Sequence, residues 1–187
     1  MDPGLARPIW VMIEGQFLQG QRMSAINASP LPDSALLARY QRDGAYADCY
    51  ATDLGFAATH AQFVTAFYTT WLFKLERLIL EWTLSRPSSD AQAAELAAGR
   101  IDEFAAWRVE ARAPDQLLLT DIHGRTRSWL MVTPLNSGGT RLYFGSAVVP
   151  HGARASLGIG FRALLGLHRL YSVALLSAAR ARLPAAR

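Results

Sequence analysis

The alternation of hydrophobic and polar residues divides the chain into extended and helical stretches. Residues 45–54 alternate well enough to predict a first strand. Thr59 and Gln62 then form a capping-box pattern, which predicts the start of a long helical run with apolar side chains at helical spacing. The β-branched pair Thr69 and Thr70 interrupts this run, so we expect it to form two helices.

The second half of the chain follows a different pattern. A small helix is predicted between Ser89, its N-cap, and Gly99, which ends it. From Phe104 to Pro150 the period changes to two, and the turn sequences APDQ, IHGR and LNSGG separate four strands, as in an antiparallel meander. Residues 156–183 carry an apolar stripe at helical spacing, which predicts one long C-terminal helix.

The first 44 residues show neither pattern over a long stretch. We expect residues 1–44 to form a leader segment that is partly irregular, with one short helix at residues 34–40. The opening has no basic region ahead of an apolar run, so it does not resemble a signal peptide. Residues 45–187 should then form a single domain of the α+β class.

This order of elements resembles the helix-grip architecture of the START-like (SRPBCC) superfamily. The resemblance rests on the strand, helices, meander and terminal helix between Tyr46 and Leu183, and on the segments TRSWLMV and TRLYFGSAVV. The superfamily includes lipid-transfer domains, polyketide cyclases and many uncharacterised bacterial proteins. Membership implies a curved antiparallel sheet that grips the last helix, with a ligand cavity between sheet and helix.

Two-residue turns at the APDQ and IHGR sequences predict the register of the meander. In that register Thr120 opposes Arg127, and Arg108 opposes Asp121 in a cross-strand ion pair. One face then carries Trp107, Val109, Ala111, Leu118, Thr120, Ile122, Arg125, Arg127, Trp129 and Met131. We expect this face to meet the C-terminal helix and the face with Arg108 to meet solvent. One additional residue in the first turn would exchange the faces of the Arg108 strand.

Arg127 on an apolar face requires a negatively charged or polar partner, because an unpaired interior guanidinium is costly. Glu76 on the long helical run could be a structural partner, and a bound carboxylate or phosphate could be a functional one. Both alternatives remain open. Trp129 and Trp107 are candidates for the core or for a ligand platform, since large aromatic side chains serve both purposes.

His168 on the last helix is a second candidate for chemistry. It could act as an acid or base or hydrogen-bond a ligand, because histidine titrates near neutrality. The alternative is an interior histidine with its hydrogen bonds satisfied. Tyr143 and Tyr171 are weaker candidates of the same kind, and His60 is expected to be exposed. The residues that would carry catalysis are unknown.

Charge and motifs exclude several classes of protein. All fifteen acidic residues lie at or before Asp121, and nine arginines with no carboxylate follow it. Nucleic acid is not the expected partner, because aromatics and glycines are not interleaved with these arginines. A single cysteine and four scattered histidines predict no metal site, and no cofactor motif is present. The apolar stretch of the last helix contains Arg162, His168 and Arg169, so we expect no transmembrane segment and a cytoplasmic location.

The sequence therefore favours a protein that is not an enzyme and binds a small apolar or acidic ligand, such as a hydrophobic acid or lipid, in a cavity under the last helix. The expected ligand-binding residues are Arg127, Trp129, Trp107, Tyr143, His168 and Tyr171. One alternative is a cyclase, hydratase or isomerase on the same scaffold. Another is an interaction protein that uses its basic surface, and a homodimer is compatible with either.

Overall fold

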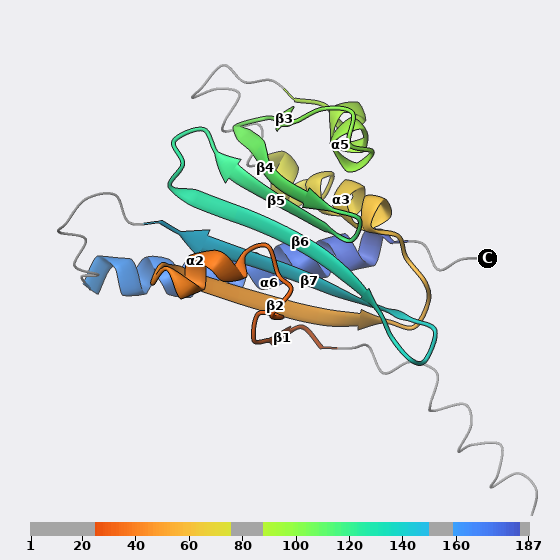
Figure 1. Cartoon of the computed structure of the whole chain (residues 1–187), viewed down its shortest axis with the longest axis horizontal. Helices are drawn as coiled ribbons and strands as arrows, with labels where there is room; N and C mark the ends of the chain where they lie inside the picture. Colours follow the sequence, from red (N-terminus) through yellow and green to blue (C-terminus); the bar gives the residue numbers. More distant parts are fainter. Residues whose placement is uncertain (1–24, 76–87, 150–158, 184–187) are drawn as a thin grey trace, which may run out of the picture.

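The computed structural model describes residues 25–75, 88–149 and 159–183, and Figure 1 shows its arrangement. Seven antiparallel strands form one sheet in the order β1-β2-β7-β6-β5-β4-β3. The strands are β1 (Asn27–Ala28), β2 (Tyr46–Leu54), β3 (Glu103–Phe104), β4 (Trp107–Ala113), β5 (Gln116–Asp121), β6 (Thr126–Pro134) and β7 (Thr140–Val148). The helices are α2 (Ala38–Arg42), α3 (His60–Tyr68), α5 (Asp90–Ala97) and α6 (Ile159–Arg182).

This is the predicted α+β fold, with an antiparallel meander against a long C-terminal helix and helices inserted after the strand β2. Strands β4 to β7 are consecutive hairpins, and β2 pairs with β7 along its whole length. In Figure 1 α6 lies behind β2 and β7, and α3 lies behind the other half of the meander. The arrangement is consistent with a helix-grip fold.

Local side-chain hydrogen bonds fix both ends of α3. Thr59 Oγ1 accepts the backbone N–H of Gln62 at 3.2 Å, and the Gln62 side chain accepts the N–H of Thr59 at 2.8 Å. At the other end the hydroxyls of Thr69 and Thr70 donate to backbone carbonyls one turn earlier. These hydroxyls compete with the backbone amides, so the predicted break is confirmed and a new helical stretch begins at Trp71.

The capping predictions for α5 are also confirmed. Ser89 accepts the backbone N–H of Gln92 at 3.2 Å in a second capping box, and Gly99 follows the helix with φ +73°. A residue with a side chain is strained at such a positive φ, which is why glycine ends the helix. Among the described strands, the sequence prediction missed only the two-residue strands β1 and β3.

Both faces of the sheet are buried against hydrophobic cores. The helix face packs against α3 and α6 through a large cluster of buried residues that includes Tyr50, Leu117, Leu119, Leu130, Leu142, Phe144, Phe63, Phe67, Leu175 and Leu176. The N-terminal face packs against residues 31–40 through a smaller cluster that includes Cys49, Leu118, Trp129, Met131, Ala147, Ala35, Leu37 and Ala38. The sheet is therefore a central layer with both faces covered, rather than a sheet with one face exposed to solvent.

Residues 25–44 form the cover of the N-terminal face. Leu37 is fully buried, and β1 extends the sheet beside β2. The Gln116 side chain accepts the Leu36 N–H at 2.9 Å and donates to the Ser34 carbonyl at 3.0 Å. The prediction that this segment is a leader apart from the domain is thus wrong for residues 25–44, and the helix begins at Ala38 rather than at residue 34. Residues 1–24 lie outside the described part of the chain.

A β-bulge in β4 changes the predicted register. Val109 pairs with Leu119, but Ala111 pairs with Leu118, so Glu110 is an additional residue without a partner opposite it. The sequence permits an additional residue in the neighbouring turn, whereas the structure places it within the strand.

The bulge changes which side chains share a face. Thr120 pairs with Arg127 as predicted, but Arg108 also pairs with Thr120 instead of forming the expected pair with Asp121. Trp107 lies on the helix face. Trp129 and Arg127 lie on the N-terminal face, so the prediction that their face meets the C-terminal helix is wrong.

Candidate functional site

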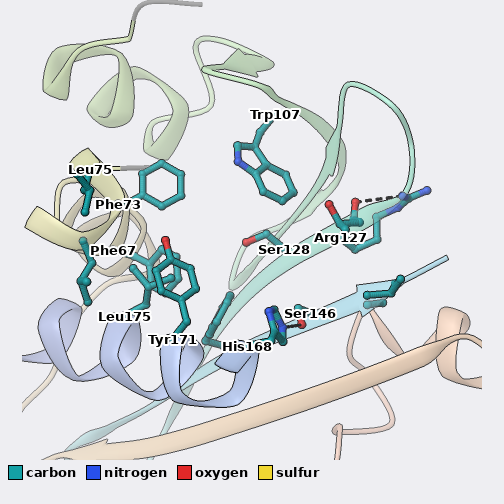
Figure 2. A pocket seen from close by; sticks show the side chains of 15 residues that line it. Phe67, Phe73, Leu75, Trp107, Arg127, Ser128, Ser146, His168, Tyr171 and Leu175 are labelled. Carbon is teal, nitrogen blue, oxygen red and sulfur yellow. Dashed lines mark hydrogen bonds between the residues drawn. The ribbon is translucent and has the colours of Figure 1, made fainter. Parts of the chain in front are cut away.

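A cavity of about 580 Å³ lies between the helix face of the sheet and helices α3 and α6. This volume is within the range of small-molecule pockets, which is roughly 300–1,000 Å³. Its described lining residues are Phe67, Leu72, Phe73, Leu75, Trp107, Thr126, Arg127, Ser128, Phe144, Ser146, Ala147, Val148, His168, Tyr171 and Leu175. Most of the lining is apolar, and Figure 2 shows polar side chains both on the sheet, at Ser128 and Ser146, and on α6, at His168 and Tyr171.

Two neighbouring strands supply buried serines to the floor of this cavity, and a third strand places a carboxylate beside them. Asp48 on β2 pairs with Ser146 on β7, which pairs with Ser128 on β6. The Ser146 hydroxyl lies 2.6 Å from Asp48 Oδ1, and the Ser128 hydroxyl lies 3.1 Å from the Tyr68 hydroxyl. Ser128 and Ser146 are both buried. Their pairing across the strands places a strip of hydrogen-bonding groups beneath an otherwise apolar space.

His168 reaches these groups from α6. Its Nε2 atom lies 2.7 Å from Ser146 Oγ and 3.7 Å from Asp48 Oδ2. The side chain of His168 is 33% exposed, whereas that of Asp48 is 11% exposed. The histidine is therefore held at its tip by a buried serine and a nearly buried carboxylate, and the rest of its ring borders the cavity (Figure 2).

Two further groups surround the Asp48 carboxylate. The Tyr46 hydroxyl donates to Asp48 Oδ2 at 3.3 Å, and the Arg169 side chain is hydrogen-bonded to Tyr46. Burial and the neighbouring carboxylate raise the pKa of Tyr46 above its ordinary value. Tyr46 therefore remains a neutral donor, which suits a group that stabilises a carboxylate.

Trp107 and Tyr171 also line the cavity, as the sequence analysis expected. Trp107 extends from β4 on the side opposite His168 in Figure 2, and Tyr171 projects from α6, one turn after His168. The Nε1–H group of Trp107 is buried and has no acceptor among the residues that the structure describes.

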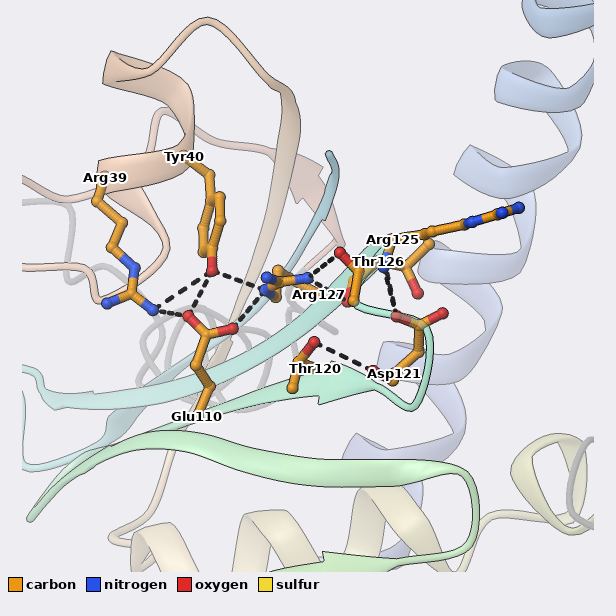
Figure 3. A network of polar contacts seen from close by, with 9 residues as sticks. Arg39, Tyr40, Glu110, Thr120, Asp121, Arg125, Thr126 and Arg127 are labelled. Carbon is orange, nitrogen blue, oxygen red and sulfur yellow. Dashed lines mark hydrogen bonds and ion pairs between the residues drawn. The ribbon is translucent and has the colours of Figure 1, made fainter. Parts of the chain in front are cut away.

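Arg127 does not provide a cation to the cavity. Although it is a lining residue, its guanidinium extends away from the other polar groups in Figure 2. On the N-terminal face Arg127 Nε lies 2.5 Å from Glu110 Oε2 and 2.7 Å from the Tyr40 hydroxyl, and its Nη1 donates to the carbonyls of Gly124 and Thr126 (Figure 3). The predicted alternative of a structural ion pair is correct in kind.

The partner of Arg127 differs from the one that was predicted. The bulge turns Glu110 to the N-terminal face, where it also pairs with Arg39 and accepts a hydrogen bond from Tyr40. The guanidinium of Arg127 stacks over the Tyr40 ring at 4.6 Å. Glu76, the predicted partner, lies outside the described residues. The charge of Arg127 is satisfied without any ligand.

Trp129 and Tyr143 lie on the N-terminal face and are separated from the cavity by the sheet. Trp129 is fully buried and donates its Nε1–H to Gln116 at 2.9 Å, with Tyr143 packed beside it. Of the two alternatives for Trp129, the structure shows the core residue. The structure thus brings together three of the six predicted ligand-binding side chains, which are Trp107, His168 and Tyr171.

The residues that sequence reasoning missed are Asp48, Ser146 and Ser128. Alternation assigns each of these residues to one face of its strand. Serine and aspartate occur on either face of a strand, so their presence there does not indicate a site. Only the pairing of three strands and the packing of α6 bring Asp48, Ser146 and His168 together, across 98 and 22 residues of sequence. No local pattern in the sequence indicates such contacts.

Two absences concern the described residues alone. Within residues 25–75, 88–149 and 159–183, no group of three His, Cys, Asp or Glu side chains could hold a metal ion. In the same part of the chain, no helix is long and apolar enough to cross a membrane.

Comparisons with known proteins leave the family open. No family model matches the chain, and no curated protein matches it. Among solved structures, the crystal structure of protein Ms6760 from Mycobacterium smegmatis is similar at 12% sequence identity, with a TM-score of 0.39. The match covers 86% of this chain and 99% of that one.

Proposed function

We propose that this chain is a binding protein of the START-like superfamily and that the cavity under α6 holds a small, mainly apolar molecule. The observation that carries the proposal is the cavity of about 580 Å³, lined by aromatic and aliphatic side chains with a few polar groups on one side. A space of this size and composition is typical of a ligand site.

The charges of the described residues favour this proposal over a protein that acts through its basic surface. Arg141 forms two hydrogen bonds with Asp53, at 2.6 and 2.8 Å, and Arg127 is paired with Glu110. The basic residues of the second half are thus partly neutralised by acidic residues of the first half. Arginines that are paired within the fold contribute little to binding a polyanion.

Native mass spectrometry together with thermal unfolding tests the proposal. We expect the purified full chain either to carry a co-purified apolar molecule or to gain melting temperature with members of a panel of naphthalene derivatives, because a ligand that binds only the folded state stabilises it. The proposal is wrong if no molecule co-purifies and no member of the panel raises the melting temperature.

An acid–base enzyme is a second candidate, and the contact of His168 with Ser146 and Asp48 favours it. A base is commonly oriented by a group that hydrogen-bonds its other ring nitrogen, with a carboxylate nearby. Ser146 lies 2.7 Å from His168 Nε2, and the Asp48 carboxylate lies 3.7 Å away, beyond hydrogen-bonding distance. This arrangement differs from a Ser-His-Asp triad, because here the serine lies between the carboxylate and the histidine.

Cleavage of nitrobenzisoxazole, a small apolar probe, tests this second candidate. A general base removes the proton on its ring carbon, the N–O bond breaks, and a cyanophenolate forms without any co-reactant. If His168 is a base, the wild-type protein accelerates the reaction and the His168→Phe variant loses at least tenfold in rate, within the usual range for general bases. Equal rates for the two proteins would exclude the enzyme candidate and leave the binding proposal unaffected.

A further inference from the structure

The Ser146 hydroxyl determines which nitrogen of His168 carries the proton. A serine hydroxyl has one hydrogen to donate, and an ionised carboxylate can only accept. Because Ser146 Oγ lies 2.6 Å from Asp48 Oδ1, the serine hydrogen is directed to Asp48. The oxygen of Ser146 is then an acceptor toward His168 Nε2 at 2.7 Å, so Nε2 carries the hydrogen of the neutral imidazole.

The other ring nitrogen is left with a lone pair. In the neutral ring with a proton on Nε2, Nδ1 is an acceptor and cannot donate. Nδ1 has no hydrogen-bond partner among the residues that the structure describes, and His168 lines the cavity. The part of His168 that a ligand can reach therefore accepts a hydrogen bond.

The charges of the described residues around the cavity disfavour an anionic ligand. Of the described lining residues, Arg127 alone carries a permanent charge, and its guanidinium is paired with Glu110 on the opposite face of the sheet. The Asp48 carboxylate lies directly behind Ser146, and Arg169 on the same helix as His168 is hydrogen-bonded to Tyr46. A carboxylate in this apolar space would lose its hydration without gaining a cation from the residues that the structure describes.

We propose that the cavity selects apolar molecules that carry a neutral hydroxyl or N–H group, which donates a hydrogen bond to His168 Nδ1, and that it discriminates against carboxylates. This inference rests on the proposed binding function and names its ligand class. An alcohol or a phenol meets this requirement.

Three probes of matched size test the proposal by calorimetric titration of the full chain at near-neutral pH. These are naphthol, methoxynaphthalene and naphthoate, with the substituent on the same ring carbon. Naphthol should bind about tenfold more tightly than methoxynaphthalene, which cannot donate, since one additional hydrogen bond contributes about this factor. Naphthoate should bind more weakly than both.

The outcomes separate the two proposals. If none of the probes binds, and the panel and mass spectrometry above also find no ligand, the binding function itself is wrong. If methoxynaphthalene binds as tightly as naphthol, or naphthoate binds most tightly, the binding function stands and the hydroxyl selectivity is overturned. His168→Phe should remove the preference for naphthol, whereas the exposed turn variant His123→Gln should retain it.

The tautomer itself provides a test that needs no variant. Long-range nitrogen–proton correlation spectra of the neutral imidazole should show that His168 carries its proton on Nε2. Addition of naphthol should shift the Nδ1 resonance. In Ser146→Ala the oxygen that orients the ring is removed, so the preference for this tautomer should weaken. A wild-type His168 with its proton on Nδ1 would overturn the proposal.

Discussion

His60 shows how burial changes the pKa of a single side chain in this protein. The sequence predicts an exposed His60 because it begins α3, but its Nε2 atom is buried and has no hydrogen-bond partner among the described residues. Burial lowers the pKa of His60, and a hydrogen bond to the Leu130 backbone opposes that shift only in part. The sequence prediction is therefore wrong, because a position at the start of a helix does not reveal what packs over it.

The lowered pKa of His60 predicts a loss of stability in mild acid. Because the folded-state pKa lies below the unfolded-state value, the contribution is complete above the unfolded-state value, near 6.5 for an ordinary histidine, and is lost as pH falls through the folded-state value. Urea unfolding at a series of pH values should show a steeper decrease in unfolding free energy for the wild type than for His60→Leu. Parallel curves for the two proteins would contradict this assignment, and His123→Gln is the control at an exposed position.

At the scale of elements, the strand β2 and the meander β4 to β7 follow from the sequence, but the place of β2 beside β7 and the faces of the strands do not. The capping boxes, the break after Tyr68, the meander turns and the final helix are all marked by local chemistry. The consecutive residues Leu117, Leu118 and Leu119 are all buried because both faces of β5 are covered, so alternation cannot assign them to sides. The bulge at Glu110 has no glycine or proline to mark it.

The bulge has an energetic consequence through the ion pair that it allows. The side chains of Arg127 and Glu110 are only 11% and 18% exposed, so removal of one leaves the other charge poorly solvated. Arg127→Met should lower the free energy of unfolding by on the order of 3 kcal/mol, measured by urea unfolding. The double variant Glu110→Leu with Arg127→Met should recover much of that loss, because it removes both charges.

The neighbouring Arg125 is the control for this experiment. Its side chain is exposed, so Arg125→Ala should change the free energy of unfolding by less than about 0.5 kcal/mol. If Arg127→Met is as mild as Arg125→Ala, the network in Figure 3 does not stabilise the fold.

Close packing of β7 between its neighbours gives a second prediction at this scale. A Cβ atom at Gly145 would lie 2.9 Å from the Asp48 backbone oxygen, from a Leu37 methyl group and from the Trp129 ring. Gly145→Ala should therefore destabilise the protein by roughly 1–3 kcal/mol, as measured by thermal or urea unfolding. Gly55→Ala, where a Cβ meets nothing within 4 Å, should have little effect. Equal stabilities would show that the N-terminal segment is not packed against Gly145.

At the scale of the whole molecule, the sheet separates a closely packed face from a face with a cavity. The N-terminal face contains the Arg127–Glu110 ion pair, the Gln116 hydrogen bonds and Trp129, all satisfied within the protein. The helix face retains a cavity, a buried indole N–H without a described partner, and His168 beside Ser146. The sequence indicated a cavity beneath the last helix, but it assigned Arg127 to that cavity because the covering role of residues 25–44 was not recognised.

Filling the cavity tests its role as a binding site most directly. Val148 lines the cavity, whereas Thr133 lies on β6 at an alternate position to Ser128 and Leu130 and so faces the other side of the sheet. We expect Val148→Trp to weaken naphthol binding at least tenfold in calorimetric titration without lowering the melting temperature, and Thr133→Trp to bind like the wild type. Undiminished binding by a folded Val148→Trp protein would contradict the account, because the ligand would then occupy some other place.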